Sequence, residues 1–285
     1  VRATLNTSKT SKRIIDSIAL KGYEKFPKSF ISYFAGVKKG DAFDKQQLLK
    51  KNNALNSLGF ANSIKPPQAL FEKKKTTLYL YLEKQNFNTF DGIIGFATNE
   101  QTQNIVFNGY IDLVLNNNLN YGEQFVLKYK ADGADQENLN LKTTLPYIFK
   151  TPFGIQAQLN IFRRDSTFSS ASQNLRVSYQ ISPSSKANVG FAAKTSNDLL
   201  SENQSPENLE DYSSSFLTTG VTFIKLQLNT LFPIKTFLNL DIGIGNRKTT
   251  SRKTGQVTLS NVINHSFYIN QKNSIYLQNV DIWNI

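Results

Sequence analysis

The chain has 285 residues, enough for one large domain or two ordinary ones. Only 39% of its residues are hydrophobic and the mean hydropathy is −0.36, and the sequence holds no run of about 18 apolar residues, so it predicts no transmembrane helix. Cysteine is absent, which excludes disulfides and thiolate metal sites.

The net charge of +12 is distributed unevenly along the chain. Residues 1–84 hold 17 Lys and Arg against 6 Asp and Glu, a net of +11, whereas residues 85–285 hold 16 against 15, a net of +1. This asymmetry predicts a domain boundary and a basic surface facing an anionic partner, either lipid head groups or acidic clients. A merely solvated domain surface is the alternative. Nucleic acid is disfavoured because the basic residues Lys73 to Lys75 form only a short run.

The first segment reads as a small mixed domain with the order β-α-α-β-β. A strand at 14–22 alternates apolar and polar residues, and Pro27 suits the first turn of a short helix. Asp44 is a good N-cap for a second helix, which ends at Gly59. Two strands follow at 60–71 and 77–83. Pro66 and Pro67 cannot donate to a strand ladder, so the first of these two is expected at a sheet edge, where the prolines either frame a pairing site or simply block aggregation.

The rest of the chain alternates apolar and polar residues along successive strands, with short turns expected at one end and long polar loops at the other. Leu175, Val177, Tyr179 and Ile181, for example, fall on the opposite face from the polar residues between them. This layout is typical of an antiparallel, up-and-down transmembrane β-barrel, with an apolar exterior and a polar lumen. We expect eleven strands, at 90–98, 104–115, 123–130, 138–145, 155–163, 174–181, 187–194, 216–229, 237–245, 256–268 and 275–284.

The N-terminal segment resembles a POTRA (polypeptide-transport-associated) domain. The resemblance is carried by the glycines and hydrophobic residues of the stretches 18–22, 37–43, 55–60 and 78–82. Placed after it, the strands resemble the barrel of the BamA/TamA superfamily, most closely at 90–96, at 109–115 and in the turn 118–123. We therefore expect a linker at 1–11, a POTRA-like periplasmic domain at 12–84 and the N-terminal part of an outer-membrane barrel at 85–285.

The superfamily barrel has sixteen strands and an Arg-Gly hallmark in a loop after strand eleven. This sequence contains no Arg-Gly pair, begins at Val1 without a signal peptide, and stops at Ile285, at the end of the eleventh expected strand. We therefore expect it to be a trimmed piece of a longer protein.

The resemblance implies a function in the bacterial outer membrane, where the chain would assemble, insert or translocate other β-barrel proteins. The implied partners are unfolded outer-membrane protein clients and outer-membrane lipids, with periplasmic chaperones or accessory lipoproteins left open, and no nucleic acid or cofactor. A client strand would pair at the barrel seam, for which the candidates are Phe90, Asp91, Gly92, Ile93, Ile94, Gly95 and Phe96. A second edge, in the POTRA sheet, has the candidates Ile64, Lys65, Pro66, Pro67 and Gln68.

Two other classes of function compete with assembly. An outer-membrane hydrolase is disfavoured because His265 is the only histidine and no Gly-x-Ser-x-Gly elbow exists, and a metal site is disfavoured for lack of ligands. Asp112 and Asp241 are expected to line the polar lumen rather than to form an acid–base pair. A passive outer-membrane pore would account for the barrel but not for the N-terminal domain.

Overall fold

The structure is a computed structural model that describes residues 12–98, 103, 105–133, 136–164, 167–198, 211–226, 234–250 and 257–260. The chain divides into two compact units, Val1–Gln85 and Asn86–Ile285. The expected linker at 1–11 and the expected strand at 275–284 lie outside the described residues. Within the described residues, no helix has the length and apolar character needed to cross a bilayer.

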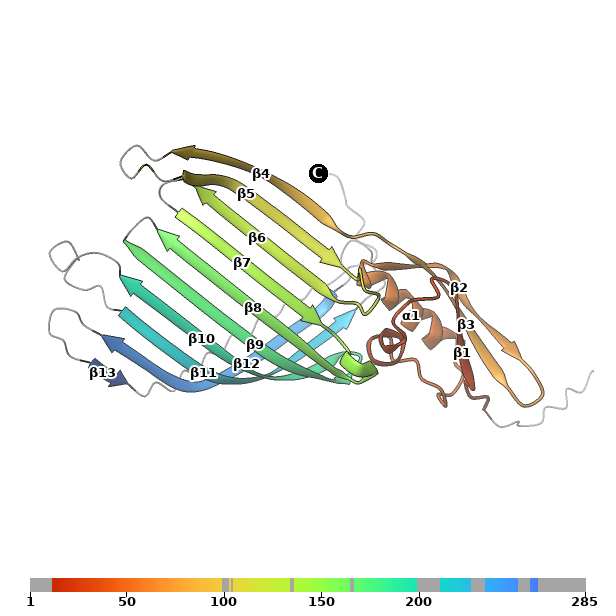
Figure 1. The fold of residues 1–285 in the computed structure, drawn as a ribbon. Coiled ribbons are helices and arrows are strands. Elements are labelled where there is room, and N and C mark those ends of the chain that lie inside the picture. The colour runs from red at the N-terminus through yellow and green to blue at the C-terminus, as the bar shows by residue number, and fades with distance from the viewer. Residues whose placement is uncertain are drawn as a thin grey trace, which may run out of the picture. The chain divides into compact units, whose positions relative to one another are not determined.

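The N-terminal unit has the expected β-α-α-β-β order around a three-stranded sheet (Figure 1). The strand order is β1-β3-β2, with β1 parallel and β2 antiparallel to the central strand. The first helical element is a single π-helical turn that begins three residues after Pro27. The elements are β1 (Ser17–Gly22), η1 (Phe30–Phe34), α1 (Lys45–Leu55), η2 (Asn56–Leu58), β2 (Ala61–Phe71) and β3 (Thr76–Lys84).

The helix signals in the sequence act as expected. The carboxylate of Asp44 accepts a hydrogen bond of 3.1 Å from the backbone N–H of Gln47, which satisfies a donor that the first turn of α1 would leave unpaired. Gly59, directly after η2, has a φ of 76°. A residue with a Cβ adopts that backbone conformation only at a cost, so glycine fixes the point where the chain leaves the helix for β2.

The unit has an ordinary apolar core between the helices and one face of the sheet. Alternate residues of β3 are buried in it: Leu78, Leu80 and Leu82 are each at most 2% exposed. The ring of Phe30 packs edge-to-face on Phe60 with centroids 5.2 Å apart. A buried core of this kind is what a water-exposed domain requires. Its other large buried members are Ile15, Phe26, Ile31, Val37, Leu48 and Leu55.

The C-terminal unit is one antiparallel sheet of ten strands in which each strand pairs with its neighbours in sequence (Figure 1). This is the up-and-down order that the alternating pattern predicts, and it confirms the predicted fold class. The strands are β4 (Thr89–Thr98), β5 (Ile105–Asn116), β6 (Gln124–Asp132), β7 (Gln136–Leu145), β8 (Phe153–Arg164), β9 (Phe168–Ser182), β10 (Ser185–Asp198), β11 (Asp211–Leu226), β12 (Ile234–Thr250) and β13 (Val257–Ser260).

The expectation of long loops at one end of the sheet is wrong for two connections. The segments 131–137 and 164–173 were expected as loops, but the strands continue into both, so that only 133–135 and 165–167 connect them. The turns at the opposite end, 117–123 and 146–152, are longer. The polar run that opens β9 is held as a strand by pairing with both β8 and β10 rather than by burial of apolar side chains.

The burial of this sheet is inverted relative to the N-terminal unit. Leu175, Val177 and Tyr179 are 51%, 43% and 44% exposed, whereas Arg176 and Ser178 between them are half-buried. Cross-strand register extends the same division to the neighbouring strands β8 and β10, so the face that carries these residues is largely apolar there. In water such a face would be unfavourable; in a bilayer it is the face that lipid covers.

The polar face is the concave one. The guanidinium of Arg176 on β9 reaches the carboxylate of Asp241 on β12 at 3.9 Å, although the two strands are three positions apart in the sheet. In a flat sheet that separation would be about 14 Å, which the two side chains could span only if both lay fully extended along the sheet. The sheet therefore curves around its polar side chains, as a barrel wall curves around a lumen.

The apolar face is limited to a band. On β10, Ala187, Val189, Phe191 and Ala193 share this face, and polar residues from Thr195 onward continue it at the loop end. At the turn end, the rings of Phe153 and Tyr179 pack with centroids 5.0 Å apart. Aromatic side chains at the border of an apolar band are typical of a membrane–water interface.

Candidate functional site

The first strand of the large sheet, β4, contains every predicted seam residue from Phe90 to Phe96. It stands at one end of the strand order and, in the described part of the chain, pairs with β5 alone. Its side chains are open to solvent, with Phe90 73% and Phe96 77% exposed. The far side of β4 therefore presents a row of backbone N–H and C=O groups that no described strand satisfies.

Two glycines bring the backbones of β4 and β5 unusually close. Gly109 of β5 has a φ of 116°, and a Cβ placed there would overlap the carbonyl oxygen of Ile93. A Cβ at Gly92 would lie 2.8 Å from the carbonyl oxygen of Tyr110. Glycine at these positions is thus required by the close approach of the two strands, and the same positions contribute no side chain to hold the pair together.

Two carboxylates face each other across this pair. Asp91 of β4 and Asp112 of β5 are directly opposed in register, an arrangement that destabilises strand pairing. Each has a separate partner on the polar face: the hydroxyl of Tyr110 donates to Asp91 at 3.1 Å, and the ammonium of Lys128 donates to Asp112 at 2.8 Å. The expected strand ends, at 98 and 104, would have placed Asp91 opposite Ile111, so this opposition could not be predicted from the sequence.

The predicted edge of the N-terminal sheet lies in β2, which is an outer strand of the order β1-β3-β2. The register shifts twice, between Ser63 and Lys65 and between Lys65 and Gln68, and the second shift contains both prolines. The ammonium of Lys65 lies 3.8 Å above the ring of Tyr81, whose hydroxyl donates to Gln68 at 2.7 Å. The structure thus brings Lys65 and Gln68 together around one tyrosine, while Ile64 stays 57% exposed.

The candidates considered for chemistry are dispersed. Asp112 pairs with Lys128 on β6, and Asp241 with Arg176 on β9, so the two carboxylates belong to separate ion pairs. His265 lies outside the described residues. No group of three or more His, Asp or Glu suited to a metal occurs within the described ranges.

Comparison with known proteins identifies the first unit directly. Residues 14–84 match the family model of the POTRA domain, described as "Surface antigen variable number repeat". No curated protein matches the sequence. Residues 14–84 are therefore a POTRA domain, and it is followed by the ten-stranded sheet described above.

Two solved structures share the fold of most of the chain. One is BamA from Haemophilus ducreyi lacking POTRA domains 1–3, with 14% identity and a TM-score of 0.51 over 85% of this chain and 51% of that one. The other is CdiB from Acinetobacter baumannii, with 16% identity and a TM-score of 0.51 over 85% and 47%. The chain thus shares the fold of these two structures, a POTRA domain followed by a large antiparallel sheet, and it spans about half of their length.

Proposed function

We propose that the protein assists the assembly, insertion or translocation of β-barrel proteins in the bacterial outer membrane. The observation that carries the proposal is the edge of β4, which pairs with no described strand other than β5 and belongs to a sheet with an exposed apolar face. The POTRA domain and the fold shared with BamA and CdiB support the same class of function.

The edge provides the driving force for binding a client strand. In an antiparallel ladder about half of the backbone groups of an outer strand point away from its one partner, which for β4 means roughly ten N–H and C=O groups. Each such group costs several kcal/mol if it remains unpaired in lipid. An incoming client strand also carries unpaired backbone N–H and C=O groups. Pairing with β4 satisfies the groups of both strands, so no nucleotide is needed as an energy source.

Exchange at this edge also requires that β4 can be displaced. Gly92 and Gly109 remove side-chain contacts between β4 and β5, and Asp91 faces Asp112 across the pair. Opposed like charges weaken strand pairing by a few tenths of a kcal/mol up to about 1 kcal/mol. These features support a role for residues 90–96 as the seam that opens to accept a client.

The POTRA domain would bind the client earlier, on the periplasmic side. Ile64 to Gln68 lie on the outer strand β2, where an extended segment can add to the sheet up to the prolines. The surplus of basic residues in this domain favours acidic clients or anionic head groups as partners. Accessory lipoproteins or periplasmic chaperones remain candidates for the same surface.

Photocrosslinking tests the seam directly. A photoreactive amino acid at Ile93, 68% exposed on β4, is compared with the same residue at Leu217, 64% exposed on the doubly paired β11. In a strain that depends on the protein, we expect adducts with nascent barrel proteins at Ile93 and background at Leu217. Equal yields at the two positions, or ion conductance after reconstitution without any client adduct, would favour a passive pore instead.

A further inference from the structure

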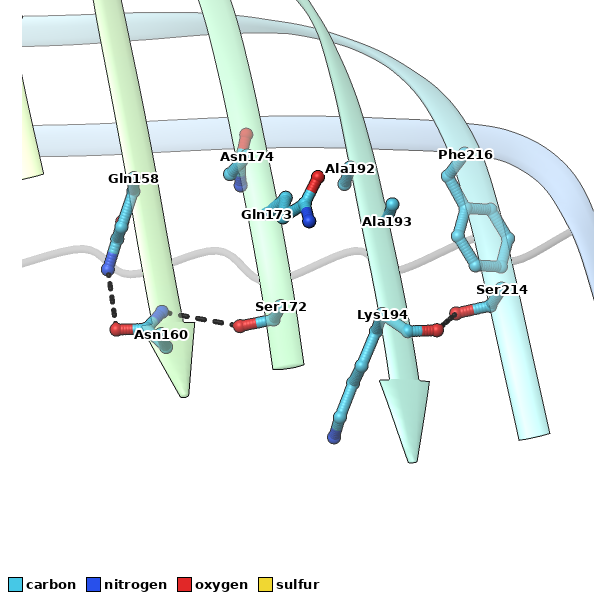
Figure 2. A pocket seen from close by; sticks show the side chains of 10 residues that line it. All are labelled: Gln158, Asn160, Ser172, Gln173, Asn174, Ala192, Ala193, Lys194, Ser214 and Phe216. Atoms are coloured by element: carbon cyan, nitrogen blue, oxygen red, sulfur yellow. Dashed lines mark hydrogen bonds between the residues drawn. The ribbon is translucent and has the colours of Figure 1, made fainter. Parts of the chain in front are cut away.

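The polar face of β8 to β11 contains a hollow near the loop end of the sheet, with a volume of about 150 Å³ (Figure 2). Four strands contribute to it, and none of its residues belongs to the seam or to the POTRA edge. We call it the wall hollow. From the polar face it is lined by Gln158, Asn160, Ser172, Asn174, Ala192, Lys194, Ser214 and Phe216, and Gln173 and Ala193, which belong to the other face by register, complete the lining.

Strand register arranges the lining in two rows across the sheet. In the first row Gln158 faces Asn174, Asn174 faces Ala192, and Ala192 faces Phe216. The small side chain of Ala192 thus lies between the carboxamide of Asn174 and the ring of Phe216, and leaves a depression between them. The second row, one step nearer the loops, runs Asn160, Ser172, Lys194, Ser214 and, on β12, Arg247.

The carboxamides and hydroxyls of the hollow have hydrogen-bonding capacity to spare. The amide of Gln158 donates to Asn160 at 3.5 Å, and the amide of Asn160 donates to Ser172 at 3.3 Å, both longer than a well-formed hydrogen bond (Figure 2). The side-chain oxygen of Asn140, which continues the second row on β7, is buried and has no hydrogen-bond partner among the described residues. Donors and acceptors held this loosely can bind a polar ligand at little cost.

Positive charge flanks the hollow. The ammonium of Lys194 and the guanidinium of Arg247 lie 5.6 Å and 4.4 Å from the ring of Tyr212, which they share. Neither row contains a carboxylate, and in the part of the chain that the structure describes Lys194 forms no ion pair. Asp241, the acidic residue on the polar face of β12, lies six residues from Arg247 along that strand and is approached by Arg176 instead.

We propose that the wall hollow binds an acidic oligosaccharide, one whose sugars carry phosphate or carboxylate groups. Carboxamides and hydroxyls match the hydroxyl groups of a sugar, the ring of Phe216 offers it an apolar face, and Lys194 pairs with its anionic substituent. An acidic peptide fits less well. The backbone groups of β8 to β11 are occupied in strand ladders, so the wall offers a peptide main chain no edge to pair with.

Calorimetric titration of the full chain, refolded in detergent micelles, tests the proposal independently of any assembly activity. The probe is phosphorylated core oligosaccharide released from lipid A, and its dephosphorylated form, inorganic phosphate and an acidic peptide serve as competitors. We expect Lys194→Gln to weaken binding about 10- to 100-fold, the effect of losing one charge-assisted hydrogen bond. Lys186→Gln is the matched control, since Lys186 lies on the same face of the same strand four rows away, and it should leave binding unchanged.

Further variants separate a true site from general charge attraction. Phe216→Ala should weaken oligosaccharide binding while leaving inorganic phosphate unaffected. A difference in gel mobility between unheated and heated samples confirms that each variant is folded. The proposal is overturned if the unmodified chain does not bind the oligosaccharide, if Lys194→Gln and Lys186→Gln weaken binding equally, or if the acidic peptide or phosphate alone binds as tightly. Because the assay contains no client, such a result would leave the role of the β4 edge intact.

Discussion

A lysine placed on the exposed apolar face should reveal what covers that face. Val189 is 54% exposed on β10 and faces Val177 on one side and Thr219 on the other. An exposed valine in water tolerates lysine with a change within about 0.5 kcal/mol. At the middle of a bilayer the same substitution costs about 2–4 kcal/mol. Val189→Lys should therefore lower the folding equilibrium constant in phospholipid vesicles by about 30- to 1,000-fold.

Thr195→Lys is the matched control for this experiment. Thr195 lies on the same face of the same strand, beyond the last apolar residue and toward the loops. Near the membrane interface we expect it to cost about 0–1 kcal/mol. The measurement is urea-induced unfolding of the full chain in vesicles, followed by gel mobility. If both variants lose less than about 0.5 kcal/mol, the exposed face contacts water and the membrane interpretation of the sheet is refuted.

Two further pairs of substitutions, each a test variant with its control, concern the seam and the POTRA core. Gly109→Ala should destabilise the β4–β5 pair by about 1–3 kcal/mol, because of its positive φ and the overlap of a Cβ with the carbonyl opposite. The control is Gly133→Ala, whose φ is also positive, at 94°, but whose Cβ would make only an ordinary contact, so it should destabilise the pair less. Hydrogen exchange of the β4 amides measures the effect of both variants. Leu80→Ala should cost about 2–5 kcal/mol in the POTRA domain, whereas Leu70→Ala, 47% exposed on β2, should change little, as judged by limited proteolysis of the full chain.

Similar amide protection of β4 in the two glycine variants would show that the close approach of the strands does not limit their pairing. Equal protease resistance of the two leucine variants would show that β3 does not carry the core of the domain.

The strands could be predicted from sequence because lipid and lumen impose opposite demands on successive residues. Each of the first ten expected strands overlaps an observed one, and the order of the sheet follows from the up-and-down connections. The start of β9 could not be predicted, since the residues from Phe168 to Gln173 show no apolar alternation and are strands only through pairing with both neighbours. The hydrophobic pattern of a sequence predicts which side chains a strand buries. It does not predict which neighbouring strands the backbone pairs with.

The edge position of Pro66 and Pro67 was predictable from their missing N–H groups, whereas the opposition of Asp91 and Asp112 depends on register and emerged only from the paired strands. The backbone of Gly109 was equally hidden, because glycine is compatible with both ordinary and positive φ. The wall hollow, finally, brings together residues of four strands that share no sequence signal.

The strands of the sheet differ in length, so its loop end is not at the same height along all strands. β6 and β7 have 9 and 10 residues, about what a tilted strand needs to cross a bilayer, whereas β11 and β12 have 16 and 17. The excess of about five residues continues past the apolar band and lifts that side roughly 12 Å clear of the lipid. A bulky molecule that approaches the membrane surface is therefore obstructed by the protruding ends of β11 and β12. It can approach the surface more closely on the side of the shorter strands β6 and β7.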